Sequence, residues 1–185
     1  NVRPEIGSAP FFAPLLVAFR ERFPAVIPEV EFTLRVVDLV EEGFDVAFRI
    51  HTGPLEQSAN LMRKRLDTIT GSLFASPAYL ERCGVPRTPD DLRDHDCLSF
   101  SHRGLSERWP MKRKGEKPFL LEIEPVLVAN DFALLLNAAL EGAGLVFAPT
   151  FIGESHLGSG ALVPVLGVWR EATGRVSRFW PRPRP

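Results

Sequence analysis

Asp94, His95, Asp96 and Cys97 carry the side chains that most often bind metal ions or act as nucleophiles. Four consecutive residues cannot all converge on one ion, because neighbouring side chains leave the backbone in different directions. A nucleophilic Cys97 with His95 as its base would also need an orienting third group and an oxyanion loop, and neither is recognisable. We therefore predict no metal site and no catalytic site here. His95 and Cys97 are expected to pack and form hydrogen bonds inside the protein.

Three further patterns suggest chemistry only superficially. Ser155 and His156 lack the G-x-S-x-G turn of a hydrolase between a strand and a helix. The glycines in Gly142–Gly144 follow a predicted helix and precede a predicted strand, the reverse of the order in a dinucleotide loop. The basic clusters Arg63–Arg65 and Lys112–Lys114 belong to a chain of formal net charge -1, which favours solvated surface over a nucleic-acid footprint. We predict no enzyme activity and no cofactor.

A different set of polar residues stands where predicted strands end, which is where open α/β sheets bind ligands. Ser8, Thr33 and Asn130 each precede a predicted helix, and hydroxyl groups and backbone amides at a helix N-terminus suit a carboxylate or another small polar ligand. Asp131 would repel an anion, so its expected role is to cap the helix. The complete predicted ligand site consists of residues at strand ends: Ser8, Thr33, His51, Thr52, Phe100, Ser101 and Asn130.

The elements that position the first half of this site follow from the spacing of apolar residues. Phe12–Phe23 has an apolar stripe at helical spacing, and Pro24 ends it. Its inward residues are expected to be Phe12, Leu15, Leu16, Phe19 and Phe23. Val30–Leu34 indicates a strand, Val36–Glu42 a short helix ended by Gly43, and Phe44–Ile50 a buried strand. A helix that leads directly into a strand is half of a parallel βαβ unit, so we predict a largely parallel sheet.

Two connections in this region are shorter than α/β units normally have. A strand cannot enter a helix at Leu34–Arg35 without a turn, and such connections usually need about two to six residues. The same holds for Pro10–Phe11, so we hypothesise that loop residues are missing at both points. The remaining predicted elements are the strands Val2–Ala9, Leu61–Leu73, Cys97–Phe100, Glu107–Lys114, Phe119–Val128, Leu145–Ala148, Leu162–Leu166 and Val176–Trp180, and the helices that begin at Pro77, Pro89, Phe132 and Phe151.

The amino-acid composition and net charge of the chain favour a folded globular protein over a disordered, nucleic-acid-binding or membrane-spanning one. The 185 residues are 45% hydrophobic, enough for one compact domain or two small lobes. With 22 basic and 23 acidic residues, the chain has no overall charge that would draw it to nucleic acid. Two distant cysteines favour a reducing cytosol, although a single disulfide stays possible. The most hydrophobic stretch, Phe132–Pro149, is interrupted by Asn137, Glu141 and two glycines, so no membrane span is expected.

Several segments, in order, resemble one family. Leu39–Ile50 (LVEEGFDVAFRI) is similar to the L-x-x-G-x-D-x-A-I-R signature of the effector-binding domain of LysR-type transcriptional regulators. Phe74–Leu80 (FASPAYL) resembles the family's C-A-S-P-x-Y-L, and Pro89–Leu98 its P-x-x-L-x-x-H-x-C-L. Ala129–Pro149 resembles the pattern N-x-x-x-x-x-x-A-A-x-x-G-x-G-I-x-x-x-P, with Asn130 at the asparagine. These segments are weak signals singly and specific as a set.

The resemblance implies an α/β, two-lobe, type 2 periplasmic-binding-protein-like fold with a ligand cleft between the lobes. Lobe I would comprise residues 1–70 and 167–185, and lobe II residues 71–166. A small-molecule effector would control a cytoplasmic homodimer or homotetramer, which would contact DNA only through an N-terminal winged helix-turn-helix absent from this chain, and no membrane. The chief alternative is a solute-binding protein of a transport system with the same fold, and an enzyme on this fold is a more distant third.

The resemblance also implies an antiparallel two-fold dimer in which helix Phe12–Phe23 lies against helix Asp131–Glu141 of a second copy. Both helices carry apolar residues beyond those needed for their own sheet, and such residues need a cover. The inward residues of the second helix are expected to be Leu134, Leu135, Ala138 and Ala139. The predicted interface residues are Phe11, Val17 and Ala18 on the first helix and Phe132, Leu136 and Leu140 on the second.

Overall fold

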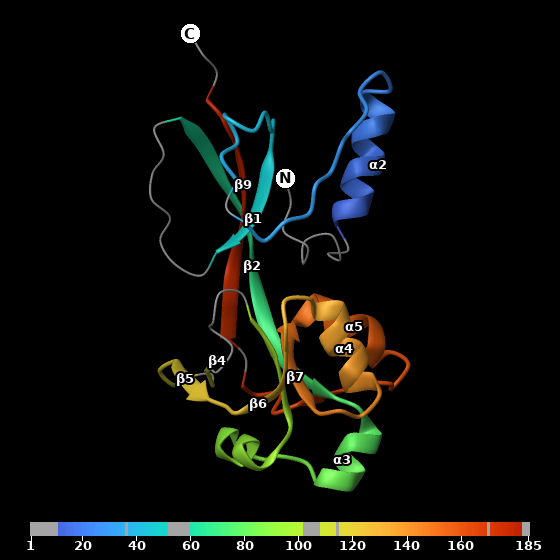
Figure 1. Cartoon of the computed structure of the whole chain (residues 1–185), viewed down its shortest axis with the longest axis vertical. Helices are drawn as coiled ribbons and strands as arrows, with labels where there is room; N and C mark the ends of the chain where they lie inside the picture. The colour runs from blue at the N-terminus through green and yellow to red at the C-terminus, as the bar shows by residue number, and fades with distance from the viewer. Residues whose placement is uncertain are drawn as a thin grey trace. The chain divides into compact units, whose positions relative to one another are not determined.

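The computed structural model of the protein describes residues 11–35, 37–51, 60–101, 108–113, 115–169 and 171–182 (Figure 1). The chain forms two compact units, which are treated separately below. Unit 1 comprises residues 1–69 and 174–185, and unit 2 residues 70–173. The strands β2 (Leu61–Ala75) and β9 (Glu171–Pro181) contribute residues to both units. The predicted strand Val2–Ala9 lies outside the described residues.

The described register in unit 1 is antiparallel. β1 (Ala47–His51) pairs with β9 in a register that runs from Ala47 opposite Phe179 to His51 opposite Arg175, and β2 lies on the other side of β9. The parallel βαβ unit stays a prediction here, because the predicted strand Val2–Ala9 lies outside the described residues. Of the predicted strand Val30–Leu34, Phe32 forms a single β-bridge and its neighbours are not in a strand. Leu34 and Arg35 are in a bend instead, in which the Arg35 amide donates to Thr33 Oγ1 at 3.3 Å.

The predicted helix Val36–Glu42 is reduced to a single turn, in which the Glu42 amide donates to the Asp38 carbonyl oxygen at 3.0 Å. The Asp38 carboxylate accepts hydrogen bonds from the amides of Val40 and Glu41, at 2.9 and 3.1 Å, as a helix N-cap does. Gly43 ends the turn at a φ of +73°, and Leu39 within the turn is buried before β1 begins.

Helix α2 (Phe12–Arg22) confirms the predicted helix but not its predicted inward stripe. Phe12 is buried and packs edge-on against Phe48 and Phe32, with ring centroids 5.5 and 6.4 Å apart. Leu15, Phe19 and Phe23 are exposed.

Unit 2 contains the parallel strands. β3 (Cys97–Phe100) is parallel both to β7 (Leu145–Pro149) and to β6 (Pro125–Ala129). The last residues of β2 extend this sheet antiparallel to β7 and also pair with β8 (Val163–Val165). The helices of this unit are α3 (Pro77–Cys83), the 3-10 helix η1 (Pro89–Asp94), α4 (Phe132–Leu140) and α5 (Thr150–Leu157).

The predicted strand Phe119–Val128 is two strands. β5 (Phe119–Glu122) pairs with β4 (Arg108–Met111) in a separate antiparallel sheet, whereas β6 begins at Pro125 and joins the main sheet. Proline has no amide hydrogen to donate to a ladder, so a strand begins at this residue more readily than it passes through it. Trp109 of β4 anchors the small sheet by donating from Nε1 to Ser99 Oγ, 3.2 Å away.

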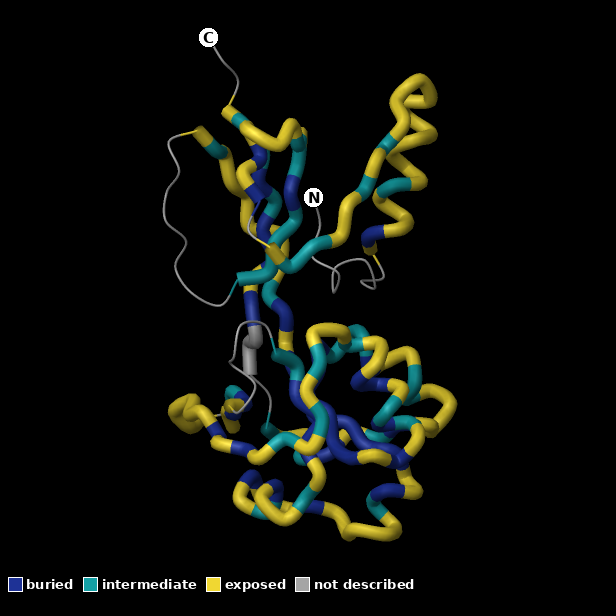
Figure 2. Tube along the Cα trace, in the orientation of Figure 1, coloured by how far each residue is buried: buried dark blue, intermediate teal, exposed yellow. Residues whose placement is uncertain are grey.

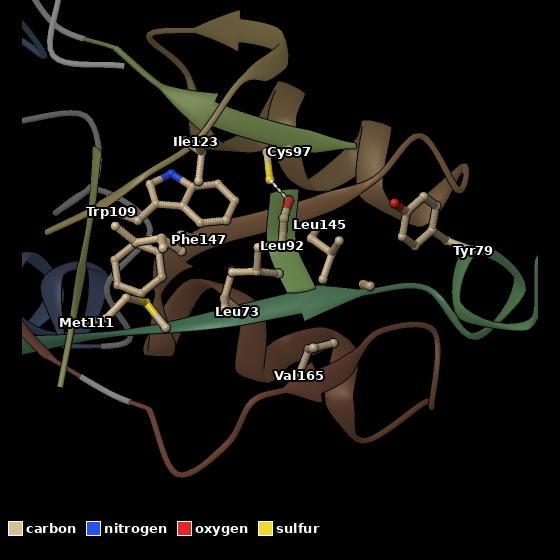
Figure 3. Packing of buried hydrophobic residues seen from close by; sticks show 12 residues of the cluster. Leu73, Tyr79, Leu92, Cys97, Trp109, Met111, Ile123, Leu145, Phe147 and Val165 are labelled. Carbon is tan, nitrogen blue, oxygen red and sulfur yellow. Dashed lines mark hydrogen bonds between the residues drawn. The ribbon is translucent and has the colours of Figure 1, made fainter. Parts of the chain in front are cut away.

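Both faces of the unit 2 sheet are buried, because consecutive strand residues enter opposite cores. Leu73, Cys97 and Leu145 contribute to one cluster, with Tyr79, Leu92 and Trp109 (Figure 3). The residues that follow them on the strands, Phe74, Leu98 and Val146, contribute to the other cluster, on the face covered by α4 and α5. Leu135, Leu136 and Ala139 of α4 pack in the same cluster. Buried core and exposed surface alternate closely along the chain (Figure 2).

The connection between α4 and β7 depends on a glycine, which gives a test of the packing. A Cβ atom on Gly144 would collide with the carbonyl oxygen of Asp96, which accepts a hydrogen bond from the Leu145 amide at 2.8 Å. We expect Gly144→Ala to lower the free energy of unfolding by about 1 to 3 kcal/mol. The matched control Gly158→Ala adds a Cβ with nothing within 4 Å, so it should be neutral or slightly stabilising in urea denaturation. Equal stability of both variants would contradict this packing.

Candidate functional site at the strand ends

Three of the predicted ligand residues lie together at the carboxyl ends of β3 and β6. Phe100 is opposite Ala129 in the parallel register, and the Ser101 amide donates to the Ala129 carbonyl oxygen at 2.9 Å. Asn130 follows at once and is exposed. The Phe100 ring stacks on Phe132, with centroids 4.3 Å apart and an interplanar angle of 9°. An apolar ring, a hydroxyl group and an amide side chain therefore share one edge of unit 2.

Asp131 has the expected capping role. Its carboxylate accepts from the Leu134 amide at 2.7 Å, and α4 begins with the next residue. Ser76 caps α3 in the same way, accepting from the Tyr79 amide at 3.4 Å. The Asp131 side chain is used to cap its own helix. Asn130, the exposed residue just before it, therefore has the side chain that can contact a ligand at the start of α4.

A hydroxyl cluster at the end of β7 was missed by the sequence interpretation. The Thr150 hydroxyl donates to the Thr70 carbonyl oxygen at 3.0 Å, and Thr150 Oγ1 lies 3.1 Å from Ser72 Oγ and 3.3 Å from Thr70 Oγ1. Since β7 is parallel to β3, Thr150 lies at the same edge of the sheet as Ser101. The rule that identified Asn130, a polar residue between a strand and a helix, would also have found Thr150.

Unit 1 contributes the other predicted residues. His51 ends β1, and its Nε2 lies 3.0 Å from Ser177 Oγ of β9, while Thr33 is in the bend before Arg35. No contact between Thr33 and His51 is found among the described residues, so the structure does not bring them together. Ser8 and Thr52 lie outside the described residues.

The Asp94–Cys97 motif is a packing and hydrogen-bonding element, as the sequence predicted for its histidine and cysteine. Tyr79 is fully buried, its Oη lies 3.1 Å from His95 Nδ1, and it accepts from the Asp96 amide at 2.9 Å. Cys97 Sγ donates to the Leu92 carbonyl oxygen at 3.6 Å (Figure 3). Burial, and then the nearby Asp96 charge, raise the pKa of Cys97 to about 12, so it is a neutral thiol rather than a nucleophile or metal ligand near pH 7.

The burial of residues on α4 shows that some of the predicted dimer-interface residues face the protein's own core instead. Leu136 is buried against the unit 2 sheet, and Phe132 and Leu140 are partly buried in the same cluster. Leu134, predicted to point inward, is instead 53% exposed. The helix is rotated relative to the prediction because Leu135, Leu136 and Ala139 face the sheet. On α2, Val17 is 59% exposed, as predicted.

Two other features of the described residues bear on the chemistry. A surface cavity of about 700 Å³ is lined by Arg93, Arg108, Glu122, Ile123, Glu124 and Pro125. None of these residues belongs to the strand-end site, and the Arg108–Glu122 ion pair at 3.3 Å is solvent-exposed, so we assign no function to this cavity. Within the described ranges, no helix is long and apolar enough to cross a membrane, and no three potential metal ligands are grouped.

Comparison with known proteins identifies the family. Residues 4–185 match the sequence profile of the LysR substrate binding domain. The chain belongs to this family. It is 33% identical over 174 residues to an uncharacterised HTH-type transcriptional regulator of Haemophilus influenzae, covering 94% of this chain and 59% of that protein. It is 32% identical to the probable HTH-type transcriptional regulator LtrA of Klebsiella pneumoniae, covering 90% and 53%. The chain thus spans between half and three-fifths of the length of these relatives.

Solved structures agree with this assignment. The regulatory domain of CrgA, a LysR-type transcriptional regulator from Neisseria meningitidis, has a TM-score of 0.80 and 25% identity, with 97% of this chain and 85% of that chain covered. The regulatory domain of the C227S variant of AphB from Vibrio vulnificus has a TM-score of 0.82 and 21% identity, covering 99% and 91%. The LysR domain therefore has the expected two-lobe α/β fold of the periplasmic-binding-protein type.

The two cysteines give a direct test of the Asp94–Cys97 assignment. Cys83 is exposed, whereas Cys97 is buried and has a raised pKa. Since the thiolate is the reacting species, iodoacetamide at about pH 8 should modify Cys83 in the native protein and Cys97 only after unfolding. Mass spectrometry of the alkylated peptides, with a urea-unfolded sample as the control, measures both. Modification of Cys97 at the same native rate as Cys83 would refute its burial as a neutral thiol.

Proposed function

We propose that this LysR domain is the effector-sensing part of a bacterial transcriptional regulator. As the family resemblance implies, a small molecule held between lobe I (residues 1–70 and 167–185) and lobe II (residues 71–166) would control DNA binding by the full-length protein. The N-terminal winged helix-turn-helix of that protein would make the DNA contacts. The observation that carries the proposal is the convergence of Phe100, Ser101 and Asn130 at one strand edge, in a chain that matches the family over residues 4–185.

The alternative of a transport solute-binding protein has less support. The similar proteins reported above are named as transcriptional regulators, and none of those names indicates transport or catalysis. We accordingly propose that the protein has no enzyme activity. We also propose that it acts in the cytoplasm, where the full-length regulator binds DNA. A DNA-binding region encoded directly before Asn1 would support the regulator, and a signal peptide there would support the transporter.

The site residues favour a small polar effector, such as a carboxylate, that also has an apolar part. Ser101, Thr150 and Asn130 offer neutral donors and acceptors, His51 adds an imidazole, and Phe100 offers a ring face. Polar groups of this kind fix the orientation of a small ligand, while the apolar wall supplies buried area. Small carboxylates and aromatic acids are therefore the first compounds to screen.

The Asn130 side chain tests the effector site. A thermal-shift screen of small carboxylates and aromatics should find a compound that raises the melting temperature, because a ligand of the folded state stabilises it. For that compound, Asn130→Ala should weaken binding by about 1 to 3 kcal/mol in isothermal titration calorimetry, through loss of a buried hydrogen bond. The matched control Asn137→Ala changes an exposed amide farther along α4 and should bind normally. Unchanged affinity in Asn130→Ala would remove this residue from the site.

We also propose that α2 of one copy packs against the α4 surface of a second copy, in an antiparallel two-fold dimer. The exposed apolar residues that support it are Phe11, Leu15, Val17 and Phe19 at α2, and Val126, Val128 and Leu134 on β6 and α4. Exposed large apolar residues that gather on one surface mark interaction sites, and we propose that these residues do so. A stable two-fold interface should bury at least about 1,000 Å² of total surface.

Val17→Glu combined with Leu134→Asp should therefore give a monomer by light scattering, because both charges would be buried at the dimer interface without partners. The control Val85→Glu with Val168→Glu introduces two acidic residues at similarly exposed apolar positions outside this surface, and should remain dimeric. If the unmodified domain is monomeric at high concentration, or the first variant is still a dimer, this interface is wrong.

A further inference from the structure

The first half of β2 is a strand that is exposed on both faces. Every residue of Met62–Asp67 is exposed, whereas burial resumes at Ile69 (Figure 2). Alternate residues of a strand point to opposite faces, so Arg63 and Arg65 share one face, and Met62, Lys64 and Leu66 share the other. Neither face of this segment is covered by the residues that the structure describes.

This segment also has a free edge. β9 lies on one side of β2 in unit 1, and the Arg182 amide donates to the Asn60 carbonyl oxygen at 2.9 Å (Figure 1). On the other side, pairing begins only at Gly71, where β2 meets β7 in unit 2. Within the described ranges, Leu61–Asp67 therefore has, on this side, a row of backbone donors and acceptors with no neighbouring strand, which is the template that extended peptides use for strand addition.

The exposed first half of β2 carries three consecutive basic residues, Arg63, Lys64 and Arg65, although the chain as a whole is nearly neutral. In the described part of the protein, none of them lies within ion-pair distance of a carboxylate. Asp67 is the acidic residue in the segment, and its carboxylate accepts from the neighbouring Thr68 amide at 2.7 Å. Arg65 donates from Nη2 to the neutral Thr68 hydroxyl at 3.2 Å, so among the described residues the three positive charges are not neutralised by a carboxylate.

We propose that this edge of β2 is a docking site for an acidic, extended segment of a partner protein, which binds as an added strand. Carboxylates on one face of the added strand pair with Arg63 and Arg65. On the other face, an acidic residue meets Lys64 between two apolar residues that contact Met62 and Leu66. The backbone ladder gives affinity and the alternating side chains give specificity. This surface is independent of the proposed effector site.

Two other occupants fit the edge less well. A second copy of β2 paired antiparallel about Lys64 would place lysine opposite lysine and Arg63 opposite Arg65, and directly opposed like charges destabilise a sheet. Nucleic acid would use the positive charge but not the unpaired amides and carbonyl groups of the strand, and the net charge of -1 adds no general attraction. The charge and the free edge together favour an acidic polypeptide.

The test uses a fluorescent peptide with the sequence Glu-Val-Glu-Asp-Glu-Val-Glu, which reads the same in both directions and so fits either strand orientation. Fluorescence anisotropy should show saturable binding. Arg63→Glu with Arg65→Glu should weaken this binding by about tenfold or more, since it places like charges opposite each other. The control Arg87→Glu with Lys112→Glu makes the same change of net charge at exposed residues of unit 2, and should change affinity less than about twofold.

A second probe separates strand addition from charge alone. The same peptide with alternate amides N-methylated keeps its carboxylates but loses one row of donors, so the unmodified domain should no longer bind it. Equal binding of both peptides, equal loss in both double variants, or displacement of the peptide by duplex DNA would each overturn the proposal. The N-methylated peptide is tested on the unmodified protein, so this outcome does not depend on how well a variant folds.

Discussion

The parallel pairing of β3 with both β6 and β7 is the constraint on which the unit 2 site depends. Parallel strands end at the same edge of a sheet, so the residues that follow them are brought together although they are far apart in sequence. Ser101, Asn130 and Thr150 are such residues. These strands are buried on both faces of the sheet, and this fixes their register. A shift by one residue would move every side chain from one hydrophobic cluster into the other. The packing that stabilises the sheet therefore also positions the polar groups.

Local signals with a simple physical cause were read correctly from the sequence. Asp131 was predicted as a helix cap and a helix was predicted to begin at Pro77, and in the structure Asp131 and Ser76 each accept a backbone amide of the helix that follows. The segments around them became α3 and α4. The packing and hydrogen-bonding role predicted for His95 and Cys97 is also confirmed. These inferences needed only the geometry of a few neighbouring residues.

Errors arose where distant contacts decide the outcome. The periodicity of Val36–Glu42 fits a helix, but the chain leaves the helical turn at Gly43 and continues into β1, which pairs with the distant β9. Apolar spacing on α4 suggested that Leu134 points inward, whereas the approach of the helix to the sheet selects Leu136. Thr150 was missed because Pro149 was taken only as the end of a strand. Neither the rotation of a helix nor the partner of a strand can be read from local spacing alone, since both depend on residues elsewhere in the chain.

The most direct test of this account is an NMR titration of the ¹⁵N-labelled domain with the carboxylate that stabilises it most. If the ligand binds at the carboxyl edge, the backbone amide resonances of Ser101 and Asn130 should shift, together with that of Phe151 at the start of α5. Those of Leu145 and Val163, at the amino ends of β7 and β8 and so at the opposite edge of the sheet, should stay in place. Shifts confined to the amino-terminal ends of the strands, or to the β4–β5 sheet, would contradict the account.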